Sequence, residues 1–472
     1  MTIKFGTEGW RAVMADEFTV ENVRIVTQAI AEHYLEQRRS GSGALTLAVG
    51  HDTRFLSPMF AKAVCEVLAG NGIRAVLTDR AVPTCAVSRY VVDKQLPAGI
   101  MVTASHNPAI YNGLKIKAAY GGSATSDTVA AVERRIGGSS VKRVDLDDAI
   151  ANAAVVQSSE FVPMFLKGIR AFIDLPLIRR SRFHVIAEAM HGAAGTLVEQ
   201  LIGKGACRVD TLHGDPDPRF GGRAPEPIPS NLTDVMAAVK RRHADLAICN
   251  DGDADRLGII GPNGMWLNPG QVMCVLIKHL SAHRGMKGAV VKTVSNTMMI
   301  NRLCDAQGIT LIETPVGFKY IAQLMLEQDI LIGGEESGGI GVKGYMPERD
   351  GIVNGLLTLE AMAARKQKLS VIMAELEKSY GQWFYGRRDL HLKMEQVETL
   401  FSRLTSSPPE SLAGIAVASV NRLDGVKLIG RDDSWLLFRR SGTEPIVRIY
   451  AESPKKSQLS RLLEFGVGLI GR

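Results

Sequence analysis

The sequence lacks the features of a secreted, disulfide-bonded or membrane-spanning protein. Its six cysteines include no Cys-x-x-Cys pair and mostly lie in apolar contexts (residues 65, 85, 207, 249, 274 and 304), so we expect reduced thiols in the core. No apolar run approaches the roughly 18 residues that a membrane span needs. The first eight residues lack the apolar centre of a signal peptide. We therefore expect a soluble, cytoplasmic protein.

A concentrated charge of one sign is also missing. Lys and Arg together number 56 and Asp and Glu 49, which gives a net charge of +7, and the short basic runs are isolated from one another. A nucleic-acid-binding protein more often gathers its basic residues on one face. Cations spread along the chain suit a small anionic substrate better, although an ordinary solvated surface would have the same composition.

What is present is a repeated β/α pattern in a chain of 472 residues, long enough for roughly three to four domains. In the first part, predicted helices alternate with predicted strands, which indicates a parallel sheet covered on both faces. Residues 5–11, with two glycines, are interpreted as a loop. Two further β/α cycles follow and suggest fold duplication. The last ~90 residues alternate in polarity instead and predict an α+β domain with a largely antiparallel sheet.

The first candidate site follows the predicted strand 98–102. Ser105 stands where this strand gives way to a loop, beside His106, and Pro108 disfavours helical backbone at Asn107. We expect the hydroxyl on an extended or turn backbone, at a strand end where α/β folds often place chemistry. Neighbouring side chains on a strand point to opposite faces, so His106 is not automatically the base for Ser105. A plain turn is the alternative.

Three aspartates at alternate positions follow the predicted strand 246–249, and they form the strongest single signal. Asp251, Asp253 and Asp255 should point to one side of an extended loop, with Gly252 allowing the backbone to bend. Such an oxygen-only set suits a hard divalent cation, Mg²⁺ above all. Without a cation the carboxylates would raise one another's pKa. An acidic surface turn is the alternative.

Two glycine-containing loops offer groups for a sugar phosphate. Residues 334–339 (Gly-Glu-Glu-Ser-Gly-Gly) place carboxylates where they could accept hydrogen bonds from sugar hydroxyls. Residues 439–445 (Arg-Arg-Ser-Gly-Thr-Glu-Pro) combine guanidinium groups, hydroxyls and a glycine, as a phosphate site requires. Each loop alone could be a surface turn. Together with a metal triad and Ser105, they favour phosphoryl transfer over acyl transfer.

These motifs occur in the order seen in α-D-phosphohexomutases, the phosphoglucomutase/phosphomannomutase family, and residues 5–11 resemble that family's start. The resemblance covers essentially the whole chain. It implies an α/β fold of four domains around a central cleft, with three related mixed α/β domains and a C-terminal α+β domain. The predicted domains are 1–155 with the phosphoserine loop, 156–263 with the metal loop, 264–382 with the sugar-specificity loop and 383–472 with the phosphate-binding loop.

The resemblance also implies roles for individual residues. Ser105 would be the phosphorylated serine, and one of its phosphate oxygens would join Asp251, Asp253 and Asp255 around Mg²⁺. Glu335 and Ser337 would contact sugar hydroxyls, and the phosphate that is not reacting would be bound by Arg439, Ser441, Gly442 and Thr443. Further positions that line the active site would be Arg11, His106, Lys115 and Arg256. Lys115 is a candidate for proton transfer, and we expect a depressed pKa if it is buried beside cations.

The implied reaction has two phosphoryl transfers. Phospho-Ser105 would convert a hexose 1-phosphate to a hexose 1,6-bisphosphate, and the other phosphate would return to Ser105 after the intermediate has turned over. The substrates would be small hexose phosphates, with no nucleic acid or membrane involved, and the protein would be a monomer or homodimer.

The chain departs from the bacterial dual-specificity phosphomannomutase/phosphoglucomutases at two positions. Gly339 stands where they often have histidine, and residues 315–319 (Pro-Val-Gly-Phe-Lys) lack a second histidine, so Lys319 or Arg349 is the candidate for substrate binding instead. The motifs look more like those of phosphoglucomutases, while Glu336 and Thr103 argue against phosphoglucosamine mutases. A phosphomannomutase, a dual-specificity mutase and a Mg²⁺-dependent sugar phosphatase with Asp251 as nucleophile remain alternatives.

Overall fold

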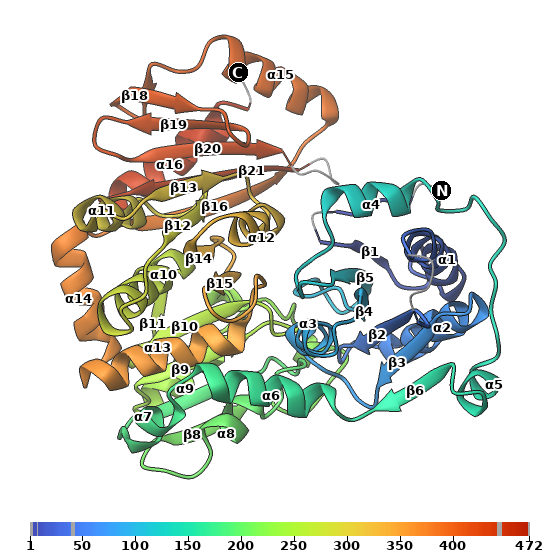
Figure 1. The fold of residues 1–472 in the computed structure, drawn as a ribbon. Helices are drawn as coiled ribbons and strands as arrows, with labels where there is room; N and C mark the ends of the chain where they lie inside the picture. The colour runs from blue at the N-terminus through green and yellow to red at the C-terminus, as the bar shows by residue number, and fades with distance from the viewer. Residues whose placement is uncertain (1–2, 7, 39–42, 441–445, 471–472) are drawn as a thin grey trace.

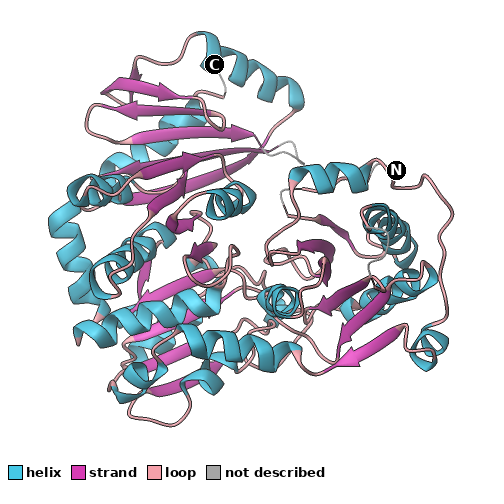
Figure 2. Ribbon diagram, in the orientation of Figure 1, coloured by secondary structure: helices cyan, strands magenta, loops and turns pink. Residues whose placement is uncertain are grey.

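The computed structural model describes residues 3–6, 8–38, 43–440 and 446–470. In these ranges the chain forms four sheets in succession, each accompanied by helices (Figure 1, Figure 2). The first sheet and its helices, coloured from blue to teal, lie to one side of the view, and the last sheet, in red, lies above the third. The predicted four-domain α/β fold is confirmed, with mixed sheets in the first three domains.

The first sheet has the strand order β1-β5-β4-β2-β3-β6. Its strands β2, β3, β4 and β6 are parallel, whereas β5 pairs antiparallel with both β4 and β1. The elements are β1 (Trp10–Val13), α1 (Val20–Glu36), β2 (Thr46–His51), α2 (Ser57–Gly70), β3 (Arg74–Thr78), α3 (Thr84–Asp93), β4 (Ala98–Val102), β5 (Tyr111–Ala118), α4 (Ser126–Glu133), α5 (Leu146–Ala151) and β6 (Val155–Ser158).

Two predictions for this domain were wrong. The sheet is mixed rather than parallel, and β1 begins at Trp10, inside the segment interpreted as a loop. β5 was missed because Lys115 and Lys117 interrupt its apolar pattern. Both lysines are buried, which is possible only because carboxylates from other domains pair with them.

The second sheet has the order β11-β10-β9-β7-β8, and β10 runs antiparallel to β9. Its long loop, residues 213–230, contains two short 3₁₀ turns, η1 and η2. The elements are α6 (Phe161–Phe172), α7 (Leu175–Arg180), β7 (His184–Glu188), α8 (Leu197–Ile202), β8 (Arg208–Leu212), η1 (Phe220–Gly222), η2 (Pro229–Asn231), α9 (Thr233–Arg242), β9 (Leu246–Asn250), β10 (Leu257–Gly261), η3 (Pro262–Gly264) and β11 (Met265–Leu267).

The third sheet has the order β13-β12-β14-β15, and only β15 runs antiparallel to its neighbour. Helix α10 begins with a capping box, in which the side chains of Asn268 and Gln271 each bond the other's backbone N–H. The elements are α10 (Pro269–Lys278), η4 (His279–His283), β12 (Ala289–Thr293), α11 (Met298–Gln307), β13 (Leu311–Thr314), α12 (Phe318–Glu327), β14 (Ile330–Gly334), β15 (Ile340–Val342), α13 (Gly351–Arg365) and α14 (Leu369–Tyr380).

The C-terminal domain has a sheet of order β16-β21-β20-β19-β18-β17 in which every pairing is antiparallel, as predicted. Helices α15 and α16 accompany it. The elements are β16 (Phe384–His391), α15 (Met394–Ser406), β17 (Ser411–Leu412), β18 (Ile415–Asn421), β19 (Val426–Gly430), β20 (Trp435–Arg440), β21 (Ile446–Ser453) and α16 (Lys456–Gly468).

One of the hydrophobic clusters extends through the first three domains, and the first domain also has a separate cluster of its own. Residues of α3, α6, β9 and α13 belong to the same buried cluster, and the rings of Tyr90 and Phe161 stack at 4.0 Å across the junction of the first two domains. Because burial of apolar surface holds the domains together, their loops are fixed relative to one another. β6 and β11 extend their sheets to Ser158 and Leu267, so we place the first two domain boundaries after these strands.

The six cysteines are buried and unpaired. Among the described residues no helix combines the length and the apolar character that crossing a bilayer would require.

Candidate active site

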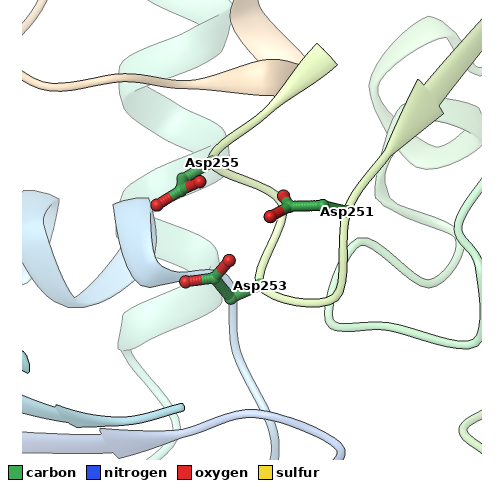
Figure 3. Close-up of side chains that lie close together, drawn as sticks. All are labelled: Asp251, Asp253 and Asp255. Atoms are coloured by element: carbon green, nitrogen blue, oxygen red, sulfur yellow. The ribbon is translucent and has the colours of Figure 1, made fainter. Parts of the chain in front are cut away.

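The three aspartates predicted as metal ligands converge in the hairpin loop between β9 and β10. Figure 3 shows their carboxylates turned toward one another. One oxygen of each lies within 4.8 Å of the others, and the side chains of Asp251, Asp253 and Asp255 are completely buried. The strand β10, which the sequence did not predict, closes the loop from the far side and sets this convergence.

Gly252 lies in the turn of this loop, where a bend was predicted. The left-handed φ of 61° belongs to Ala254. Gly252 is instead needed for close approach, because a Cβ there would lie 2.6 Å from the carbonyl oxygen of Ser105. The absence of a side chain lets the metal loop lie directly against the Ser105 loop.

The described residues around the triad fit a divalent cation. The Oδ1 atoms of Asp253 and Asp255 are buried and have no hydrogen-bond partner, which is costly for carboxylate oxygens. Their Oδ2 atoms accept hydrogen bonds from Lys115 Nζ, at 2.7 and 2.9 Å. A hard cation bound by oxygen ligands would satisfy the two oxygens that the protein leaves unpaired.

Ser105 lies in a turn beside this loop, in the left-handed region with a φ of 53°. Its hydroxyl donates a hydrogen bond of 2.9 Å to Asp251 Oδ2, and its backbone N–H donates to Thr103 Oγ1 at 2.9 Å. His106 Nδ1 lies 3.4 Å from the same hydroxyl oxygen. The structure thus brings the predicted serine to the predicted metal ligands, across 146 residues of sequence.

His106 and Lys115 have opposite pKa shifts. Burial, reinforced by Arg256 and Arg11, lowers the pKa of His106 well below its ordinary value, so the imidazole is neutral. Burial would also lower the pKa of Lys115, but the carboxylates of Asp253, Asp255 and Glu8 outweigh it and raise that pKa. The expected depressed pKa of Lys115 is therefore wrong, because the prediction counted neighbouring cations and not the carboxylates in contact.

The arginines assigned to the site lie around the same loops. Arg11 Nη1 donates to Asn107 Oδ1 at 2.9 Å, and the backbone N–H of Arg256 donates to Asp251 Oδ1 at 2.9 Å. Lys319 Nζ is 3.3 Å from Ser126 Oγ, which connects the third domain to the first. These predicted residues therefore border the loops that carry Ser105 and the aspartates or connect neighbouring domains.

Arg349 occupies a position that joins three domains. Its guanidinium contacts Asp255 at 2.7 Å, Glu335 at 3.3 Å and also Glu8. The side chain is only 2% exposed, so in this arrangement it binds protein carboxylates. Glu8 was missed as a site residue, although an acid close before Arg11 was a possible signal. Next to this cluster, Lys117 of β5 forms a buried ion pair with Glu348.

The sugar loop divides its residues between the ionic cluster and a cavity. Glu335 is buried against Arg349, and burial, opposed by Arg349, raises its pKa to about 7. Glu336 and Ser337 line a cavity of about 1010 Å³ between the second, third and fourth domains. Glu336 also accepts a hydrogen bond of 2.9 Å from Thr293 Oγ1. The cavity is large enough for a small ligand.

The predicted phosphate loop is described only at its start. Arg439 Nε donates to Asp424 Oδ2 at 2.7 Å, and its side chain remains partly exposed. Ser441, Gly442 and Thr443 lie outside the described residues.

Comparison with known proteins gives one consistent result. Models described as phosphoglucomutase/phosphomannomutase alpha/beta/alpha domains I, II and III match residues 2–141, 163–264 and 268–380, and the C-terminal domain model of the same family matches residues 401–466. A phosphoglucomutase/phosphomannomutase of Thermococcus kodakarensis is 27% identical, over 99% of this chain and 98% of its own length.

Other relatives are described by different substrates. A protein of Methanobrevibacter smithii described as a phosphoglucosamine mutase is 31% identical, over 99% of this chain and 98% of its own length. A solved structure described as a phosphomannomutase of Thermus thermophilus is 33% identical, with a TM-score of 0.87 and full coverage of both chains.

Proposed function

The chain belongs to the phosphoglucomutase/phosphomannomutase family of α-D-phosphohexomutases, and from this we propose that it moves a phosphoryl group between O1 and O6 of a hexose by way of phospho-Ser105. We further propose glucose 1-phosphate and glucose 6-phosphate as the preferred pair. The family makes the chain an isomerase that acts by phosphoryl transfer on sugar phosphates. The residue roles and the sugar are the proposed parts.

The observation that carries the proposal is the 2.9 Å hydrogen bond from the Ser105 hydroxyl to Asp251 in the metal triad. A serine that attacks an acyl group needs a base, but here the hydroxyl donates its hydrogen bond to Asp251, while His106 Nδ1 lies farther away, at 3.4 Å. A serine beside a cation site is better placed to carry a phosphoryl group. Asp251, Asp253 and Asp255, with an oxygen of phospho-Ser105, would hold Mg²⁺, which would neutralise negative charge on that group.

The proposed reaction transfers the phosphoryl group twice. The bond from Ser105 Oγ to phosphorus breaks as a bond forms to the free hydroxyl oxygen of the hexose monophosphate, which gives the hexose 1,6-bisphosphate. After that intermediate reverses its orientation, Ser105 Oγ attacks the other phosphate. With its raised pKa, Lys115 rests as the ammonium. It would protonate Ser105 Oγ as the Oγ–P bond breaks and take up the proton that the attacking hexose hydroxyl releases, and the reverse exchange would accompany the return of the phosphoryl group. Arg11, His106 and Arg256 would orient the phosphoryl group.

The substrate contacts follow from the family resemblance and from the cavity. Glu335 and Ser337 would accept or donate hydrogen bonds to sugar hydroxyls, and the distal phosphate would be held by Arg439, Ser441, Gly442 and Thr443. Ser337 supports this role because it lines the cavity. Glu335 and Arg349 contact each other at 3.3 Å, so a sugar that bonds Glu335 must compete with Arg349. Because Arg349 binds protein carboxylates, we propose Lys319 for a direct phosphate contact.

The preference for glucose rests on the Gly-Phe-Lys and Gly-Glu-Glu-Ser sequences at residues 317–319 and 334–337. A phosphomannomutase or dual-specificity enzyme is the alternative, and relatives described as phosphoglucosamine mutases make glucosamine 1-phosphate a necessary comparison. An assay with glucose, mannose and glucosamine 1-phosphates, each with a trace of the matching 1,6-bisphosphate, would rank the substrates. A higher kcat/KM for mannose or glucosamine 1-phosphate would contradict the glucose preference.

Phosphopeptide mass spectrometry tests the carrier role directly. After incubation with glucose 1,6-bisphosphate and Mg²⁺, we expect phosphate on Ser105, and we expect Ser105→Ala to reduce isomerisation to background. Ser406→Ala, at an exposed hydroxyl of α15, is the matched control. A Ser105→Ala protein with full activity would overturn the proposal. Net release of inorganic phosphate faster than isomerisation would instead favour the sugar phosphatase.

A further inference from the structure

A single buried arginine binds the backbone of the Ser105 loop at four points. Arg54 follows β2 and is 1% exposed. Its Nη2 donates to the carbonyl oxygens of Ser105 and Asn107, each at 2.6 Å, and its Nη1 donates to those of Pro108 and Tyr111 at 2.9 and 3.0 Å. The planar guanidinium fork can serve several acceptors in one fixed geometry, which a lysine ammonium cannot.

Two polar neighbours complete a frame around Ser105. Asp52 accepts from Thr103 Oγ1 at 2.6 Å and lies 3.2 Å from Arg54 Nε. Thr103 Oγ1 in turn accepts from the backbone N–H of Ser105. The two backbone groups of Ser105 are therefore both bound, the N–H by Thr103 and the carbonyl by Arg54, and Asp52 links the two.

This frame supports a backbone conformation that serine does not adopt readily. Ser105 has a φ of 53°, in the region where side chains other than glycine are strained. Such a conformation persists only where the surroundings fix it. The frame fixes it here, and the hydroxyl consequently points to Asp251.

The second domain contributes the contact that confines Arg54. The Phe220 ring, from the loop at residues 213–230, lies with its centroid 4.8 Å from Arg54 Cζ. Phe220 is 1% exposed and itself has a φ of 53°, a strained value for a bulky residue. A desolvated arginine over an aromatic face is held by cation–π attraction. The long loop therefore contacts the Ser105 loop through Arg54.

We propose that Arg54 is a positioning residue that holds the Ser105 hydroxyl at the metal loop, and that Phe220 of the second domain keeps the Arg54 guanidinium in place. Arg54 binds the backbone of the Ser105 loop, so we expect it to act through the phosphoryl carrier. The inference rests on the proposed carrier role of Ser105. It predicts a loss of kcat with little change in KM for the hexose phosphate.

Three variants separate positioning from general stability. Arg54→Lys keeps the charge and loses the fork, and displacement of the hydroxyl by about 1 Å should lower kcat on the order of 10²-fold. Phe220→Leu keeps an apolar side chain and should lower kcat several-fold. Phe172→Leu is the matched control, because Arg284 lies over that ring at a similar 4.9 Å; its kcat should equal that of the wild type.

The measurements are kcat, KM and the rate at which Ser105 takes phosphate from glucose 1,6-bisphosphate, followed by intact mass spectrometry. In Arg54→Ala, added guanidinium ion should restore part of that phosphorylation rate. Wild-type rates in Phe220→Leu and Arg54→Lys, or a rise in KM without loss of kcat, would overturn the inference. If the Arg54 variants do not fold, the kcat and the phosphorylation rate of Phe220→Leu test the inference. Absence of phosphate on wild-type Ser105 would instead contradict the proposed function.

Discussion

Replacing Gly252 with alanine should separate the metal loop from the Ser105 loop. The added Cβ would lie 2.6 Å from the Ser105 carbonyl oxygen and 3.0 Å from Pro225 Cγ. A relaxed carbon–oxygen contact is about 3.3 Å or longer, so the loops must move apart by roughly 0.7 Å. Neither loop can yield easily, since Arg54 binds the Ser105 carbonyl and the Gly252 N–H donates to the Pro225 carbonyl.

The displacement sets the expected magnitudes. Overpacking of this kind costs about 1–3 kcal/mol of stability. A misplacement approaching 1 Å at a reacting group lowers the rate by up to about 10²-fold, so we expect kcat for Gly252→Ala to fall by roughly one to two orders of magnitude. Steady-state kinetics and urea unfolding measure the two effects separately.

A glycine with open space around it provides the control. At Gly468, the last residue of α16, a Cβ would meet no atom within 4 Å, and alanine there should leave kcat unchanged and stabilise the helix by up to about 1 kcal/mol. If Gly252→Ala retained the wild-type kcat, close approach of the two loops would not be a requirement for catalysis.

Two further predictions concern ions and protons. Mg²⁺ should raise the melting temperature by binding the buried Oδ1 atoms of Asp253 and Asp255, and a hundredfold excess over Kd should add about 2.7 kcal/mol of stability. In calorimetry, Asp253→Asn should lose most of this increase in melting temperature. An increase equal to that of the wild type would contradict the metal site. A hydrogen bond with Glu188 raises the pKa of His213 above 6.5, so this stabilisation is complete below that pH and is lost as pH rises through the raised pKa. His213→Asn should therefore cost more stability near pH 6 than near pH 8.5 in urea unfolding, and equal costs would exclude the linkage.

Local patterns in the sequence were sufficient to predict those helices and strands whose spacing of apolar residues is not interrupted. The sequence of residues 57–69 predicts a helix, as does that of residues 351–366, and the structure has α2 (Ser57–Gly70) and α13 (Gly351–Arg365) there. β5 was missed for a different reason. In β5, buried lysines mimic a polar surface segment, and only carboxylates from the second and third domains explain their burial. Such long-range pairing has no signal in a local window.

The candidate site shows the same limit. The spacing of Asp251, Asp253 and Asp255 pointed to their convergence, but in the structure it comes from the turn between β9 and β10 and not from an extended loop. The left-handed backbone of Ser105 could not be predicted, since it depends on Arg54, 51 residues earlier in the chain. The pKa of Lys115 was predicted in the wrong direction because its partners lie 138 and 140 residues away.

The buried ion pairs between domains also constrain the order in which the chain folds during synthesis. Lys117 leaves the ribosome with the first domain, but its partner Glu348 follows 231 residues later, roughly 10 to 50 s at usual translation rates. Burying an ammonium group without its counter-charge is costly. We therefore expect β5 to remain exchangeable with solvent in the nascent chain, and to close onto β4 only when the third domain emerges. The first domain therefore completes its packing only after the third domain has been synthesised and Glu348 has paired with Lys117.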